Sequence, residues 1–360
     1  MINVPNRDVF EEVRKHKDSS DKYQAENYSV LGAIDDIIRS AKGQAEYIAS
    51  PVEYFSCIMS SLTGNTERQR SLLYLLQLVL PSVSESVKRL KCNDCLEILT
   101  NTYKSHESEI EPSAMRSLAS CLGEIFLSQE ETNELWESGV VKRAFSVLLT
   151  LCMNDSAKVR HSAQDAVSAI LEKHSKNGFI LTSRQVIRQL DILCKEFNED
   201  AYQDVLNYLI LIAKVVLFIS PDFYPTLFQL LLKLRQHQCP MVDYRALFPV
   251  EVLLNSDRYI APELLQSLFS QLQTVATPAT GTEKDTTEYA AVLLLLCRAQ
   301  LRTDLASFLP SFLAVLRTVV DFFITPNAAL HKSLSMFLIG FFPTLADIHF
   351  AEEIGRASCR

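Results

Sequence analysis

Apolar residues recur along almost the whole chain with the 3.6-residue period of amphipathic helices, and no segment shows the alternation typical of a strand. Gly, Pro and small polar residues interrupt this pattern and are expected to stop the helices, at Pro81, Gly123, Asn177-Gly178, Ser220-Pro221, Cys239-Pro240 and Thr325-Pro326. The pattern predicts helices over residues 22–41, 50–62, 65–80, 85–104, 112–127, 140–152, 155–174, 182–197, 200–219, 222–237, 242–254, 260–275, 284–299, 303–324 and 328–342.

Taken two at a time, the predicted helices recur at roughly forty residues, which is the period of HEAT and armadillo arrays. The clearest unit runs from Gly139 to Leu171. Its first helix carries one apolar face (Val141, Phe145, Leu148, Leu149 and Cys152), and its second carries a stripe with small members (Val159, Ala163, Ala166, Val167 and Ile170). Asn154 or Asp155 can cap the second helix. The sequence therefore predicts an all-α, HEAT/armadillo-type α-solenoid of stacked antiparallel helix pairs over residues 21–350, in preference to an irregular helical globule.

The two ends of the chain are expected to lie outside the solenoid. Residues 1–20 are polar and charged, and we interpret them as a flexible lead-in. Residues 354–360 break the helical pattern and match the translation of a common sequencing adapter, so they are interpreted as a non-native tail. Residues 277–285 are interpreted as a loop between two helices.

Composition narrows the class of protein. Gly (9) and Pro (13) are sparse, and the net charge of −8 argues against a protein that coats nucleic acid non-specifically. The nine Cys lie mostly among apolar helical residues, which indicates free core thiols in a reducing compartment. The start of the chain does not resemble a secretory signal, and the most apolar stretch, 205–219, is too short to span a bilayer. We therefore expect an intracellular protein with no membrane partner.

The chain contains no recognisable catalytic motif, so no catalytic, cofactor-binding or metal-binding residue and no small-molecule substrate is predicted. One C-x-x-C is present, Cys92 to Cys95. It lies within a predicted helix whose core face would comprise Leu90, Cys95, Leu96 and Leu99. Structural thiols are therefore favoured over a zinc or redox site.

One segment is net basic within this acidic chain. Successive helices of a solenoid share a face, so its cations could line a groove for phosphate or for an acidic partner. The favoured alternative is that these cations form an ordinary solvated rim and not a binding groove. The candidate residues for RNA or partner binding are Lys142, Arg143, Lys158, Arg160, Lys173, Lys176, Arg184 and Arg188.

An ordered series of segments resembles the N-terminal HEAT region of the ribosomal RNA-processing protein 12 family: 27–39, 53–59, 73–81, 117–123 and 158–167. The resemblance implies a non-catalytic scaffold of the nucleus and nucleolus that acts in pre-ribosomal RNA processing and in assembly and export of ribosomal subunits. It also implies pre-ribosomal particles, and the Ran GTPase, as partners. The family's later domain and basic C-terminal tail have no counterpart in this sequence, so the chain looks like a fragment. The alternative is a nuclear transport receptor or a cytosolic armadillo-type adaptor.

Overall fold

A computed structural model describes residues 8–63, 68–105, 111–130, 133–175, 180–198, 202–235, 237 and 239–274, with single positions at 292, 295, 296, 299, 335 and 339. Across these residues all regular structure is helical and there is no strand, which confirms the all-α fold. The predicted tail, the loop at 277–285 and most of the last three predicted helices lie outside the described residues. The chain divides into two compact units, Met1–Val186 and Ile187–Arg360.

The first unit contains α1 to α10 and the start of α11, and most bounds agree with the predicted ranges. The helices are α1 (Glu11–Arg14), α2 (Lys22–Lys42), α3 (Pro51–Leu62), α4 (Gln69–Val79), η1 (Leu80–Ser82), α5 (Glu85–Leu90), α6 (Cys92–Ser105), α7 (Pro112–Leu127), α8 (Asn133–Glu137), α9 (Gly139–Leu151), α10 (Ala157–Ser175) and α11 (Leu181–Glu196).

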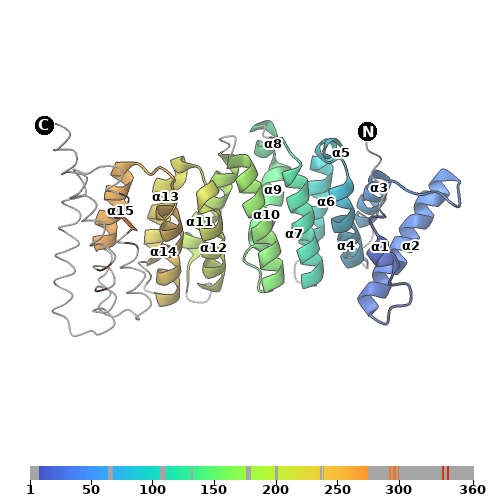
Figure 1. Cartoon of the computed structure of the whole chain (residues 1–360), viewed down its shortest axis with the longest axis horizontal. Helices are drawn as coiled ribbons and strands as arrows, with labels where there is room; N and C mark the ends of the chain where they lie inside the picture. The colour runs from blue at the N-terminus through green and yellow to red at the C-terminus, as the bar shows by residue number, and fades with distance from the viewer. Residues whose placement is uncertain are drawn as a thin grey trace. The chain divides into compact units, whose positions relative to one another are not determined.

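These helices form two layers. In one layer α2, α4, α7 and α10 pack against each other in series, and in the other α3 packs on α6 and α6 on α9 (Figure 1). Each helix of one layer also packs on its chain neighbour in the other, as α3 does on α4 and α9 on α10. This arrangement is the stack of helix pairs that defines a HEAT-type α-solenoid, in which each pair buries its apolar surface against the next.

Local sequence signals set the helix ends. The Asp21 side chain accepts hydrogen bonds from the backbone N–H groups of Tyr23 (2.8 Å) and Gln24 (3.0 Å) at the start of α2. The same helix ends at Gly43, whose φ of 66° suits a residue without a Cβ. Ser50 and Glu53 form a capping box at the start of α3, with Pro51 in the first turn.

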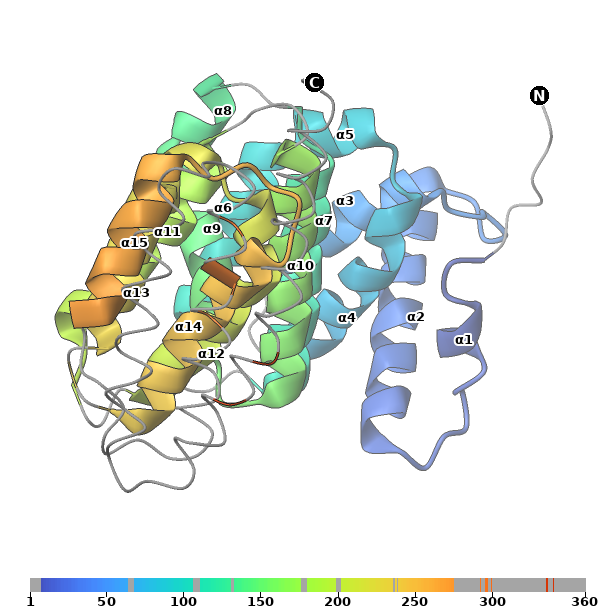
Figure 2. The ribbon, with the colours of Figure 1, turned by 60° about the vertical axis from the view of Figure 1, so that its left-hand side comes forward.

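The predicted flexible lead-in is wrong over residues 10–14, which are packed onto the first repeat. Phe10 is fully buried and its ring centroid lies 4.9 Å from that of Tyr54. Arg14 Nη1 donates to Asp35 Oδ2 (2.7 Å), and the Tyr54 hydroxyl donates to Asp35 Oδ1 (2.6 Å). Figure 2 shows α1 lying against α2. This short helix escaped the periodicity analysis because four residues are too few to display a 3.6-residue period.

The second unit is also built of helices: α12 (Tyr202–Val215), η3 (Val216–Phe218), η4 (Pro221–Phe223), α13 (Tyr224–Arg235), α14 (Pro240–Leu254) and α15 (Pro262–Thr274). Here α12 and α13 both pack on α14, and α13 also packs on α15. The buried Cys194 thiol of α11 lies 3.8 Å from the carbonyl oxygen of Leu230 in α13. This unit therefore also consists of helices packed in layers.

Candidate interaction surface

The basic segment predicted from the sequence spans α9, α10 and α11. Lys142 and Arg143, in the first turn of α9, are exposed and form no ion pair with any described residue. Lys158, at the start of α10, is also exposed and without an ion pair in the described part of the chain. These three cations are therefore available to an anionic partner.

Arg160 and Lys173 have structural roles that the sequence analysis did not foresee. Arg160 is half-buried, and its Nη1 donates to the carbonyl oxygens of Asn154 (2.8 Å) and Asp155 (3.1 Å). Lys173 Nζ donates to the carbonyl oxygens of Leu127 and Gln129 (3.2 Å) where α7 ends. Carbonyl groups at a helix C-terminus lack intrahelical partners, so a cation placed there stabilises the fold. Both residues are thus fold-stabilising, and neither is a free binding group.

The exposed cations Lys142, Arg143 and Lys158 do not gather into one continuous patch. Lys158 and Lys173 lie at opposite ends of α10, about 22 Å apart along the helix axis at 1.5 Å per residue. Because α9 and α10 are joined by a short turn, the start of α9 with Lys142 and Arg143 lies toward the Lys173 end. Arg184 is exposed on α11. Arg188 is exposed in the second unit, and Lys176 lies outside the described residues.

Arg116 is a cation that sequence reasoning missed. It is exposed near the start of α7 and has no ion pair among the described residues. The Ser120 and Ser162 hydroxyls are 3.1 Å apart, so the first halves of α7 and α10 lie side by side. Arg116 precedes Lys158 by about one repeat period, and an alignment of successive repeats could have revealed this shared position.

The C-x-x-C pair is embedded in the core. Cys92 and Cys95 are both buried at the start of α6, and burial raises the pKa of each thiol to about 12. A neutral thiol is a poor nucleophile and a poor metal ligand. Throughout the described ranges, no group of three His, Cys, Asp or Glu residues has the arrangement of a metal site.

We predict that the purified chain carries less than one equivalent of zinc, because the two buried thiols lack further ligands of suitable spacing. Elemental analysis of the wild type and of a Cys92→Ser/Cys95→Ser variant tests this. Equal, low zinc in both proteins is expected. Zinc that survives chelator washing in the wild type and is absent from the variant would show that the pair binds metal.

The stacked helix pairs place this chain among helical-repeat scaffolds of the HEAT type. A family model described as RRP12-like, N-terminal HEAT repeats, matches residues 2–259, and the chain belongs to this family. That family is a helical scaffold type and not a known enzyme family.

Two curated relatives carry the name RRP12-like protein. The Gallus gallus protein is 30% identical over 165 residues, and the Homo sapiens protein is 27% identical over 166 residues. These alignments cover 45% and 46% of this chain, and 12% of each relative. The family resemblance predicted from the ordered segments is thereby confirmed. In the part of the chain that the structure describes, no helix is long and apolar enough to cross a membrane.

Proposed function

We propose that this chain is the HEAT-repeat portion of a scaffold that binds pre-ribosomal particles in the nucleus and nucleolus. In this proposal it contributes to pre-ribosomal RNA processing and to assembly and export of ribosomal subunits, without catalysing a reaction. The observation that carries the proposal is the family match over residues 2–259, together with the RRP12-like name of both relatives. We also propose the Ran GTPase and other assembly factors as partners.

The layered construction supports this role physically. Helices α2, α4, α7 and α10 present a continuous series of helix faces, and solenoids use such extended surfaces to bind large partners. Lys158 of α10 is exposed in this layer, and Lys142 and Arg143 are exposed on α9 of the other layer; none of the three has an ion pair in the described structure. They offer contacts for phosphate groups or for acidic protein surfaces.

Depletion of the full-length protein from cells tests the role directly. We expect ribosomal RNA precursors to accumulate and the labelled protein to concentrate in the nucleolus. Normal levels of every precursor would contradict the proposal. Exclusion of the protein from nucleoli, together with shuttling of the protein with cargo, would instead support the alternative that it is a nuclear transport receptor.

We predict that a Lys142→Glu/Arg143→Glu variant of the full-length protein binds precursor particles more weakly than the wild type. If both cations contact phosphates, the dependence of log affinity on log salt should become shallower by roughly one per cation. Stability should change by only about 0.5 kcal/mol or less, because both side chains are exposed. Particle co-sedimentation across a salt series measures the effect.

The matched control is Lys17→Glu/Lys22→Glu, which makes the same change in net charge at exposed positions in and before α2. This control should bind particles as the wild type does. Equal weakening in the two variants would mean that net charge, and not the α9 surface, determines binding.

A further inference from the structure

A groove lies in the first unit where α2, α4 and α7 meet. Its volume is about 530 Å³, within the range of roughly 300–1,000 Å³ typical of ligand sites. The residues that carry the argument are Tyr23 and Asn27 from α2, Arg70 and Tyr74 from α4, and Glu111 and Arg116 at the start of α7. These three helices come from successive repeats of one layer, so the stack itself forms the groove.

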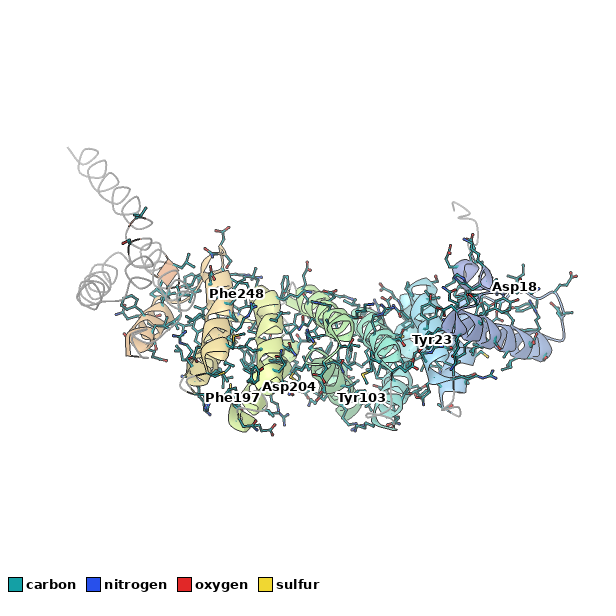
Figure 3. All side chains as sticks on the ribbon, turned by 90° about the horizontal axis from the view of Figure 1, so that it is seen from below. Asp18, Tyr23, Tyr103, Phe197, Asp204 and Phe248 are labelled. Atoms are coloured by element: carbon teal, nitrogen blue, oxygen red, sulfur yellow. The ribbon has the colours of Figure 1, made fainter. Side chains whose placement is uncertain are left out.

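One wall of the groove is an aromatic surface backed by a cation. The Arg70 guanidinium lies over the Tyr23 ring, 3.8 Å from its centroid, and holds the ring in place. Tyr23, labelled in Figure 3, lies where α2 adjoins α4 and remains 49% exposed. An apolar or aromatic side chain of a ligand can therefore pack on the open part of this ring.

The positive charge of Arg70 is already balanced by neighbouring carboxylates. Arg70 pairs with Glu26, and its Nε lies 3.9 Å from a carboxylate oxygen of Glu111. Arg70 and Arg116 are thus balanced by two carboxylates, that of the lining residue Glu111 and that of Glu26, which pairs with Arg70 from outside the groove lining. A nucleic acid strand carries a negative charge at every nucleotide and needs a surplus of cations, which this groove lacks. The balance favours a polypeptide over a nucleic acid strand.

Two polar groups at the groove lack a partner among the described residues. Asn27 Oδ1 is buried and has no hydrogen-bond partner among the described residues, although a buried acceptor without a partner is costly. The Arg116 guanidinium has no ion pair in the described part of the chain. Arg116 can bind a carboxylate directly, whereas Asn27 Oδ1 can accept a backbone N–H of a ligand only after its side chain turns toward the groove.

We propose that this groove binds an extended polypeptide segment that carries an acidic side chain. Arg116 binds the carboxylate, the Asn27 side chain turns to accept a main-chain N–H, and the Tyr23 ring packs against a neighbouring side chain. The inference concerns the first unit alone and does not depend on the role in ribosome assembly.

Selection of short random peptides on the purified full chain tests the proposal. We expect enriched peptides to share an Asp or Glu at a fixed position. The Arg116→Glu variant should bind them about ten- to a hundred-fold more weakly, as expected for loss of a charge-assisted hydrogen bond. Peptides in which that acid is replaced by Lys should bind Arg116→Glu better than they bind the wild type. Lys91→Glu, an exposed cation at the end of α5 and outside the groove lining, is the control and should bind as the wild type does.

A short single-stranded oligouridine serves as the second probe. Enrichment without a shared acid, or acidic peptides that bind the wild type and Arg116→Glu equally, would overturn the proposal. Oligouridine that binds the wild type, displaces the peptides and is lost in Arg116→Glu would assign the groove to RNA instead. Unfolding followed by Trp136 fluorescence checks that each variant is folded. Because Arg116 is exposed, its replacement should leave stability unchanged.

Discussion

A Phe145→Ala variant is expected to lose about 3–5 kcal/mol of unfolding free energy, the usual cost of removing a buried aromatic ring. Phe145 in α9 is fully buried, and its ring centroid lies 5.6 Å from Phe126 in α7 and 5.7 Å from Trp136 in α8. Truncation would leave a cavity among α7, α8 and α9. This cavity could not collapse unless a turn between the helices moved. Urea unfolding followed by the fluorescence of Trp136, the only tryptophan of the chain, measures the loss.

Ile37→Ala is the control for this experiment. Ile37 belongs to α2 in the same unit and is 54% exposed, so its truncation should change stability by about 0.5 kcal/mol or less. A Phe145→Ala transition that shifts no further than the Ile37→Ala transition would show that Phe145 is not part of a tightly packed core.

The helix pairing of residues 139–171 could be predicted because each helix must bury one apolar face. Val141, Phe145 and Leu148 of α9 are buried as expected, and so are Val159, Ala163, Val167 and Ile170 of α10. The predicted cap by Asn154 is not formed, because its Oδ1 accepts from the backbone N–H of Ser156 (3.0 Å), which lies in the turn before α10 begins at Ala157. The predicted burial of the thiols is confirmed at Cys121, Cys152 and Cys194.

Short helices and helix breaks could not be predicted from the period. Leu90 was expected on a core face with Cys95 and Leu96, but it is 82% exposed. The predicted helix over 85–104 is interrupted at Lys91, where φ is −99° and ψ is 9°, so Leu90 falls out of register with α6. Helix α8 was missed for a similar reason, since it has five residues and Trp136 is the only one buried among residues 134–137.

The chemical character of the cations could be predicted, but their partners could not. Arg160 binds carbonyl groups of the turn just before its own helix, and Lys173 binds carbonyl groups that tertiary packing brings from the end of α7, whereas Lys142 is exposed. The groove residues Asn27, Arg70 and Arg116 are about one repeat apart, so their proximity also depends on how the repeats stack.

The role of Gly123 also depends on packing and could not be predicted from the sequence. It was expected to stop a helix and instead lies inside α7. A Cβ added at this position would lie 2.7 Å from Ala166 Cβ and 3.6 Å from Ala166 Cα in α10. The small residues therefore allow α7 and α10 to approach closely. Neither methyl group could rotate away, because a Cβ is fixed to the backbone.

Gly123→Ala is accordingly expected to destabilise the first unit by about 1–3 kcal/mol, the usual cost of overpacking a core. The higher helix propensity of alanine, worth up to about 1 kcal/mol, opposes this cost but does not cancel a contact at 2.7 Å. Gly32→Ala in α2 separates the two effects, since nothing lies within 4 Å of an added Cβ there. This control should leave stability unchanged or raise it.

The double variant Gly123→Ala/Ala166→Gly tests whether the close approach is the cause. It moves the methyl group from α10 to α7 and removes the clash, so a positive coupling between the two substitutions is expected in urea unfolding. Alanine at 123 would then be tolerated, with glycine at 166 costing about 1 kcal/mol of helix propensity. If Ala166→Gly destabilises Gly123→Ala as much as it destabilises the wild type, the α7–α10 contact is not what requires glycine at 123.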